Sequence, residues 1–221
     1  MKLKAKDFLP AILLLVATIF FSILTFTVDV DAIGPAGTFV GFAKVNGAFQ
    51  QQFGFNETIY KISDYLGYLS ILGVAIFACL GLYQLIKGRG FKAVDKVIYL
   101  LGAIFVIIFA LYIGFDKLAL NFRPIIAPGE TELEASFPSS HTLMACSVMG
   151  AIAIALPNFL KDPKLVKALR VVCIIILAGT VLCRLFCGIH WVTDILAGLL
   201  ISITLLSFFK VFYVALTTKT E

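Results

Sequence analysis

A series of long apolar runs constrains this chain of 221 residues more than any other feature. Six runs, each close to 20 residues long, follow one another: 8–28, 66–86, 97–115, 142–160, 171–187 and 191–209. The first three contain no charged residue, whereas the fifth contains Arg184 and the sixth contains Asp194. A helix needs about 20 apolar residues to cross a ~30 Å hydrocarbon core, where it satisfies its own backbone. The sequence therefore predicts an all-α integral membrane bundle of six transmembrane helices, in one domain over residues 1–221.

The composition agrees with a membrane protein. Hydrophobic residues make up 61% of the chain and charged residues 14%, whereas soluble domains average roughly 45–50% and about 25%. The length leaves no room for a separate soluble domain. Lys2, Lys4 and Lys6 precede the first run, as in a signal peptide. The run is too long for one, however, and no small-x-small cleavage site follows it, so we expect a retained helix.

Most basic residues lie on one side of the predicted bundle. That side holds both termini and the connections 87–96 and 157–170, with thirteen of the eighteen Lys and Arg residues. The positive-inside rule predicts cytoplasmic termini and places residues 29–65, 116–138 and 188–190 outside. The net charge of +5 therefore describes a cytoplasmic rim that faces anionic lipid, and we expect no nucleic-acid partner.

Two of the outside connections carry structural expectations. Residues 29–65 combine glycines, a proline and recurring phenylalanines, which fits an interfacial, partly helical segment. Residues 188–190 form so short a connection that we expect the fifth and sixth helices to pack as an antiparallel hairpin. The five cysteines all lie within apolar runs and lack the spacing of a disulfide framework or a zinc site. We interpret them as small core residues.

Ionisable residues gather at the predicted outer ends of the third to sixth helices: Arg123, His141, Arg184, His190 and Asp194. Such groups are costly beside lipid, so each is a functional candidate. Guanidinium groups bind phosphate oxygens in a fork. A carboxylate can hold one histidine for nucleophilic attack while a second histidine protonates a leaving group. Each residue alone also has a structural interpretation, such as a buried polar pair or a snorkelling arginine; the joint pattern favours a phosphate site.

Spacing strengthens this interpretation. His190 and Asp194 are four residues apart, which on a helix would let the carboxylate reach the ring. The stretch Pro138-Ser139-Ser140-His141 opens an apolar run. Free N–H groups and the positive dipole end make a helix start an anion site. We therefore predict a phosphate cradle at Ser139 and Ser140, with His141 one step inside it.

These residues together resemble the type 2 phosphatidic acid phosphatase superfamily, whose pattern is K-x6-R-P, then P-S-G-H, then S-R-x5-H-x3-D. Arg123-Pro124 matches the end of the first motif, and Pro138 to His141 match the second with Ser140 in place of glycine. The third motif is Cys183-Arg184, His190 and Asp194, with Cys183 in place of serine. The resemblance covers about residues 97–210.

The first motif departs from the family pattern. The family lysine lies seven positions before the arginine, where this chain has Asp116, and Lys117 follows it. On a helix the shift turns Lys117 by about 100°. A local bulge could restore its position, it could reach phosphate from another angle, or its role could be reduced. We retain Lys117 as a candidate phosphate-binding residue.

The resemblance implies an enzyme that acts through a phosphohistidine. His190 would attack phosphorus while Asp194 holds its other nitrogen, and His141 would protonate the departing lipid oxygen. The charge of the transition state would be stabilised by the remaining motif residues: Arg123, Arg184, Ser139, Ser140 and Lys117. The resemblance implies no metal and no cofactor.

The substrate that the resemblance implies is a lipid phosphomonoester or diphosphate at the outer face of the cytoplasmic membrane. Phosphatidate, phosphatidylglycerol phosphate and polyprenyl diphosphate all remain open. A lipid-to-lipid phosphotransferase would use the same motifs. The function of a channel or lipid carrier would not require two histidines and an aspartate at this spacing. We also expect a lateral opening between helices, through which the lipid tails reach the site.

Overall fold

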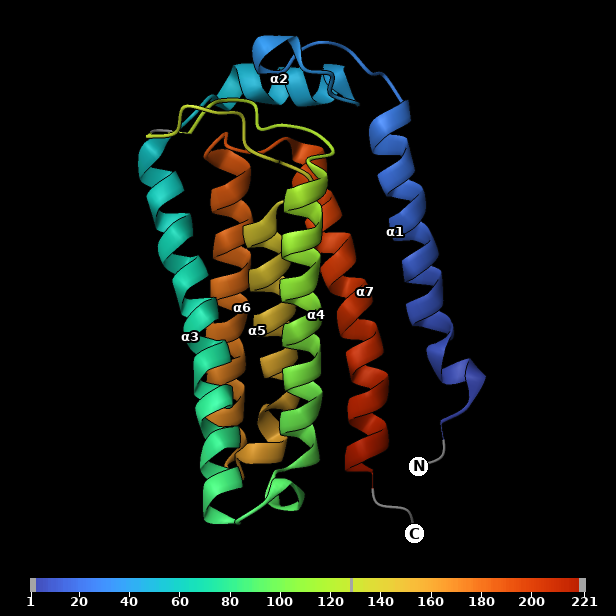
Figure 1. Ribbon diagram of the computed structural model, residues 1–221, viewed down its shortest axis with the longest axis vertical. Helices are drawn as coiled ribbons and strands as arrows, with labels where there is room; N and C mark the ends of the chain where they lie inside the picture. Colours follow the sequence, from blue (N-terminus) through green and yellow to red (C-terminus); the bar gives the residue numbers. More distant parts are fainter. Residues whose placement is uncertain (1–2, 128, 219–221) are drawn as a thin grey trace.

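The computed structural model describes residues 3–127 and 129–218. That part of the chain forms seven α-helices and three short 3-10 helices (Figure 1). Their order is η1 (Ala5–Phe8), α1 (Leu9–Thr27), η2 (Pro35–Gly37), α2 (Ala43–Phe53), α3 (Glu57–Lys87), η3 (Phe91–Ala93), α4 (Lys96–Leu118), α5 (Ser140–Phe159), α6 (Pro163–Phe186) and α7 (Val192–Thr217). The described residues contain isolated β-bridges but no strand, so the all-α prediction is confirmed.

Six helices in this part of the chain are long and apolar enough to cross a membrane, as predicted. Two of them begin earlier than the apolar runs suggest, because polar caps start them. Asn56 accepts a hydrogen bond from the Ile59 amide at 3.0 Å, so α3 begins at Glu57 rather than near residue 66. Asp162 caps the Lys164 amide at 2.9 Å, so α6 begins eight residues before 171. The apolar runs locate only the central part of each helix.

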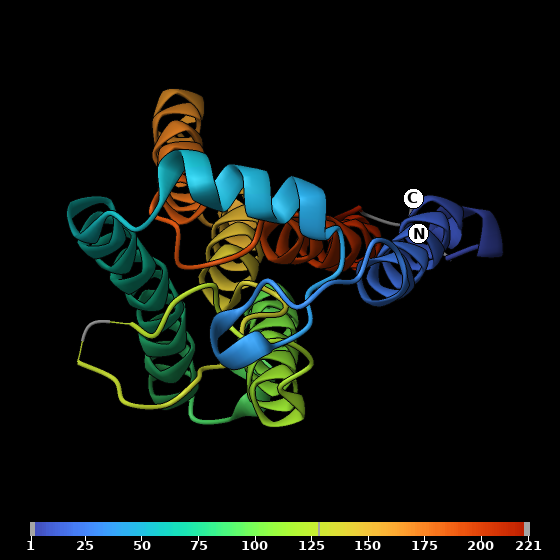
Figure 2. The same cartoon turned by 90° about the horizontal axis from the view of Figure 1, so that it is seen from above.

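Helix α5 lies at the centre of the bundle, among α3, α4, α6 and α7 (Figures 1 and 2). Small residues such as Ala145, Ala151 and Ala155 are fully buried along it and let its neighbours approach closely. The expected hairpin of α6 and α7 is wrong, because both helices pack mainly against α5 and only weakly against each other. The short connection brings the ends of the two helices together, but the helices do not pack against each other along their length.

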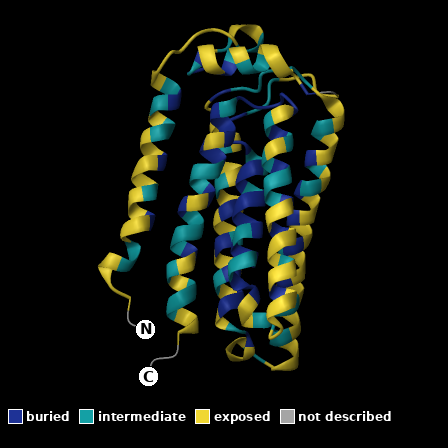
Figure 3. Ribbon diagram, turned by 180° about the vertical axis from the view of Figure 1, so that it is seen from behind, coloured by how far each residue is buried: buried dark blue, intermediate teal, exposed yellow. Residues whose placement is uncertain are grey.

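Helix α1 stands at the edge of the bundle and packs on α7 (Figure 3). The Thr18 hydroxyl forms a buried hydrogen bond of 2.9 Å with the Thr204 hydroxyl and another of 3.3 Å to the Leu200 carbonyl. Most of its large apolar side chains are exposed, as a lipid-facing helix requires.

Helix α2 lies across one end of the bundle, here called the capped end (Figure 1). Asn46 donates to the Thr193 hydroxyl at 3.0 Å, and Gln50 donates to the Gly188 carbonyl at 3.3 Å. Gly188 has φ of +69°, and a Cβ there would lie 1.8 Å from the Gly54 carbonyl oxygen. Only glycine fits this turn, so the connection between α6 and α7 is held firmly beneath α2.

Candidate active site

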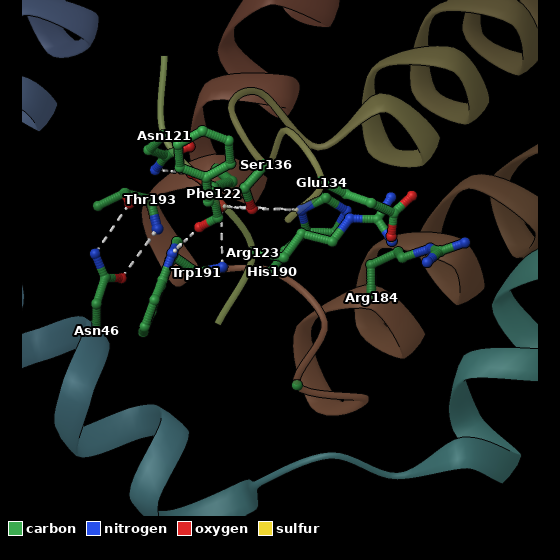
Figure 4. Close-up of polar contacts among 12 residues, drawn as sticks. Asn46, Asn121, Phe122, Arg123, Glu134, Ser136, Arg184, His190, Trp191 and Thr193 are labelled. Atoms are coloured by element: carbon green, nitrogen blue, oxygen red, sulfur yellow. Dashed lines mark hydrogen bonds and ion pairs between the residues drawn. The ribbon is translucent and has the colours of Figure 1, made fainter. Parts of the chain in front are cut away.

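The predicted ionisable residues come together at the capped end, from four parts of the chain. Arg123 lies in the connection between α4 and α5, His141 in the first turn of α5, and Arg184 in the last turn of α6. His190 lies in the connection before α7, and Asp194 lies in the first turn of that helix. Figure 4 shows the surroundings of His190, with Arg123 and Arg184 among the residues drawn.

A serine joins His190 to Asp194. The His190 Nδ1 and Asp194 Oδ2 atoms are 3.8 Å apart, too far for a hydrogen bond. The Ser136 hydroxyl donates to Asp194 Oδ2 at 2.5 Å and lies 3.1 Å from His190 Nδ1 (Figure 4). The pair is within ion-pair distance but forms no direct hydrogen bond, because α7 begins only at Val192 and His190 is not on the helix. The Asp194 carboxylate therefore orients the His190 ring through the Ser136 hydroxyl.

Further donors saturate the Asp194 carboxylate, which is fully buried. Asn121 Nδ2 donates to Oδ1 at 3.2 Å, and the Trp191 amide donates to Oδ2 at 3.0 Å. The Ser136 amide in turn donates to the Asn121 carbonyl at 3.0 Å, which aligns the two side chains on one carboxylate. Sequence reasoning missed Ser136 and Asn121, because both lie in a polar connection whose path no periodic pattern reveals.

The two serines of the predicted cradle have different surroundings. The Ser139 amide donates to the Asp194 carbonyl at 3.0 Å, so it is already used within the protein. The Ser139 hydroxyl is buried and has no partner among the described residues. Ser140 begins α5 and lines a cavity of about 280 Å³ together with Arg123. The helix start therefore faces the predicted phosphate region, with Ser139 contributing its hydroxyl rather than its amide.

Several buried polar atoms at the capped end have no hydrogen-bond partner within the described residues: Arg123 Nε, Ser139 Oγ, His141 Nδ1, Arg184 Nε and Nη1, and His190 Nε2. Most buried polar atoms in proteins are paired, so a local group of exceptions needs an explanation. Most of these atoms are donors or a ring nitrogen, which suits an anionic, phosphate-like ligand.

Asp64 is a further member of the site that sequence reasoning missed. Its carboxylate forms an ion pair with Arg184 and lies 3.3 Å from His141 Nε2. The face of Tyr60 lies 5.0 Å from the same guanidinium group. Both residues belong to the first turns of α3, which the apolar run did not include. The available signal was Asn56, whose cap places residues 57–65 on the helix.

Arg123 is held by Glu134. Their side chains form an ion pair of 2.7 Å, and the Arg123 amide donates to the Glu134 carbonyl at 3.0 Å. The pair lies at the cavity of about 280 Å³, whose lining includes Asp116 but not Lys117. Lys117 is exposed on the last turn of α4. The one-residue shift therefore turns Asp116, rather than the lysine, toward this cavity, which Arg123 and Ser140 line but the two histidines and Arg184 do not. The exposure of Lys117 argues against phosphate binding by that residue.

The surroundings of His190 determine its charge. The ring is almost completely buried, and burial, followed by the charges of Arg123 and Arg184, lowers the pKa of His190 well below the usual value. A neutral imidazole with Nδ1 held by Ser136 has its free electron pair on Nε2. This is the form that can act as a nucleophile.

The residues that the structure describes contain no group of three or more His, Cys, Asp or Glu side chains arranged to hold a metal ion. All five cysteines are free. The polar groups of the site are instead two guanidiniums, two imidazoles and carboxylates that already have partners.

Comparisons with known proteins agree with the sequence motifs. Residues 116–217 match the model of the PAP2 superfamily. Phosphatidylglycerophosphatase B of Bacillus subtilis (strain 168) is 40% identical over 93 residues, which is 40% of this chain and 43% of that protein. The chain thus matches less than half the length of this relative. The resemblance predicted from the motifs is confirmed over the part of the chain that carries them.

The fold extends the likeness beyond the motifs. The crystal structure of the first transmembrane PAP2 type phosphatidylglycerolphosphate phosphatase from Bacillus subtilis superposes with a TM-score of 0.65. The superposition covers 95% of this chain and 97% of that one, at 20% sequence identity. At this identity the comparison shows a shared fold.

The surroundings of His190 lead to a first prediction. We expect its ring to stay neutral at about pH 6.5, where a free imidazole is half protonated. The measurement is ¹⁵N NMR of histidine-labelled protein, and His141→Gln leaves His190 as the single histidine of the chain. In that background, removing a nearby positive charge with Arg123→Gln should raise the pKa of His190. A His190 ring that is half protonated at pH 6.5 with Arg123 in place would contradict this description.

Proposed function

With the PAP2 superfamily match as the premise, we propose that this chain is a membrane phosphatase that hydrolyses a lipid phosphate through a phosphohistidine. One observation carries the proposal: His190 presents a buried, unpartnered Nε2 while Ser136 and Asp194 hold its Nδ1. Two guanidinium groups with unpaired nitrogens accompany it. A nucleophilic nitrogen beside guanidinium groups that can bind phosphate oxygens fits phosphoryl transfer better than lipid transport.

In the first step, the His190 Nε2 lone pair attacks phosphorus and the bond from phosphorus to the lipid oxygen breaks. The ring becomes positively charged, and the Asp194 carboxylate stabilises that charge through Ser136. Arg123 and Arg184 bind the equatorial oxygens, whose charge is spread in the transition state. The Ser139 hydroxyl and the first-turn amides of α5 add neutral donors.

In the same step, His141 gives a proton to the departing lipid oxygen. Neutral His141 then takes a proton from a water molecule that attacks the phosphohistidine, and inorganic phosphate leaves. His190 returns to its neutral form. Positive side chains supply the charge stabilisation, so the proposed reaction requires no metal ion.

The favoured substrate class is phosphatidylglycerol phosphate. The curated relative and the crystal structure from Bacillus subtilis both carry this lipid in their names. We place the capped end on the extracytoplasmic side, because the basic segments 87–96 and 157–170 lie at the opposite end. The site would then meet phosphate headgroups at the outer membrane surface.

Replacing the nucleophile is the most direct test. His190→Gln should lower the rate of phosphate release by at least about 10³-fold, because the chain offers no second nucleophile at this position. The assay uses purified protein in detergent with phosphatidylglycerol phosphate, phosphatidate and a polyprenyl diphosphate, with and without EDTA. Acid-labile ³²P should be trapped on wild-type protein only.

Three outcomes of this assay would overturn the proposal. A His190→Gln protein that keeps more than about a tenth of the wild-type rate would exclude the nucleophile. Loss of activity in EDTA, restored by Mg²⁺ or Zn²⁺, would exclude the metal-free reaction. Transfer of the label to a second lipid without release of inorganic phosphate would identify a phosphotransferase.

Orientation can be tested on intact cells. In a background without the five native cysteines, Glu130→Cys should react with an impermeant maleimide and Lys161→Cys should not. Both side chains are exposed, at opposite ends of the bundle. Permeabilised cells, in which both variants should react, are the control. The reverse pattern would place the site in the cytoplasm.

The placement of Lys117 predicts a small mutational effect. Lys117→Ala should change kcat/KM by less than about threefold, as expected for an exposed charge. Arg123→Ala should reduce kcat/KM on the order of 10²-fold to 10³-fold, because it removes a donor to the transition state. Equal losses in the two variants would return Lys117 to the phosphate site.

A further inference from the structure

We infer that Asp64 is a positioning residue that fixes which nitrogen of His141 exchanges protons with the substrate. This inference rests on the proposed function for its catalytic meaning, although the geometry can be tested without any substrate. Asp64 lies outside the sequence motifs and on a helix, α3, that precedes the part of the chain matched by the family model.

The contact between Asp64 and His141 is built into the helix packing. Asp64 and Gly67 lie one turn apart on α3, and both meet the same imidazole ring. A Cβ at Gly67 would lie 3.0 Å from His141 Cδ2, a close contact, so the missing side chain helps α3 approach the ring. The carboxylate then lies 3.3 Å from Nε2. The ring is thus held on one face and at one nitrogen.

The chemistry of this contact selects one tautomer. An ionised carboxylate only accepts hydrogen bonds, so its position 3.3 Å from Nε2 favours the hydrogen on that nitrogen. His141 is therefore the Nε2–H tautomer when neutral, with its lone pair on Nδ1. Nδ1 is buried and has no partner in the described ranges, so it remains free for the substrate.

The two histidines then use opposite nitrogens. His190 keeps its hydrogen on Nδ1, toward Ser136, and attacks from Nε2. His141 keeps its hydrogen on Nε2, toward Asp64, and exchanges protons at Nδ1. In the imidazolium form, Nδ1–H gives its proton to the lipid oxygen as the bond to phosphorus breaks, and the electron pair of that bond stays on oxygen. Nδ1 later accepts a proton from the attacking water.

Asp64 also orders Arg184. The same carboxylate oxygen pairs with Nη2 of this fully buried arginine, while Nε and Nη1 remain unpaired within the described residues. Three charged groups thus surround His141: Asp64 from α3, Arg184 from α6 and Arg123 from the connection before α5. The Asp64 carboxylate therefore connects His141, the proton donor, to Arg184, which donates hydrogen bonds to phosphate in the proposed reaction.

A purely structural interpretation is that Asp64 only joins α3 to α6 by a partly buried ion pair. Asp64→Asn separates the two interpretations, because an amide oxygen still accepts from Arg184 but no longer dictates the tautomer. The amide can offer either its oxygen or its NH₂ group to the ring. Asp64→Glu keeps the acceptor-only chemistry and serves as the conservative variant.

The first measurement is ¹⁵N NMR of histidine-labelled protein without substrate. His190→Gln leaves the His141 signals alone, and at about pH 9 a free imidazole is neutral. We expect the Nε2–H tautomer in this background and with Asp64→Glu added, and a mixture of tautomers with Asp64→Asn added. A predominant Nδ1–H tautomer with Asp64 in place, or a tautomer ratio that Asp64→Asn leaves unchanged, would overturn the inference.

The second measurement compares leaving groups. Asp64→Asn should slow release of phosphate from an alkyl lipid phosphate by about tenfold or more, because the alkoxide needs a well-placed acid. Hydrolysis of p-nitrophenyl phosphate, whose leaving group departs without a proton, should fall less than about threefold. Equal losses on both substrates would show that Asp64 is only structural.

The matched control is Glu57→Gln, which breaks an exposed ion pair of 2.7 Å with Lys61 on the same helix. It should leave the tautomer and both rates unchanged. The tautomer result and the turnover result are separable. A protein with the expected His141 tautomer but no phosphatase activity would support the positioning of His141 by Asp64. The same result would contradict the proposed function.

Discussion

The buried carboxylate of Asp194 is the group on which the rest of the site depends. A charge without solvent is costly unless hydrogen bonds compensate it. Here the compensation comes from Ser136, Asn121 and the Trp191 amide. The Asp194 carbonyl also accepts from the Ser139 amide, at the start of α5. A single residue thus fixes the connection before α5, the start of that helix and the turn that carries His190.

The sequence predicted the membrane bundle because its signal is physical and local: an apolar run of sufficient length must become a helix in lipid. It also predicted which charged residues gather, because their spacing follows known motifs. It did not reveal Ser136, Asn121 or Asp64. The first two act through the path of a polar connection, and Asp64 acts through the packing of α3 against α5 and α6. Such contacts between distant segments leave no periodic trace in one sequence.

The errors have physical causes as well. Helical spacing does not hold for His190 and Asp194, because the helix begins after His190 and the Ser136 hydroxyl bridges the two side chains, which are 3.8 Å apart. A short connection likewise does not make α6 and α7 pack closely. The small buried residues of α5 instead make it the better partner for both helices. Loop length limits where helix ends lie, whereas side-chain volume decides which helices pack.

The position of α2 stabilises the turn between α6 and α7 at the capped end. Helix α2 covers this end and binds the turn between α6 and α7 through Asn46 and Gln50. The Asn56 amide adds a hydrogen bond of 3.0 Å to the Cys187 carbonyl. The segment with the least regular sequence pattern therefore holds the turn that carries His190 in place.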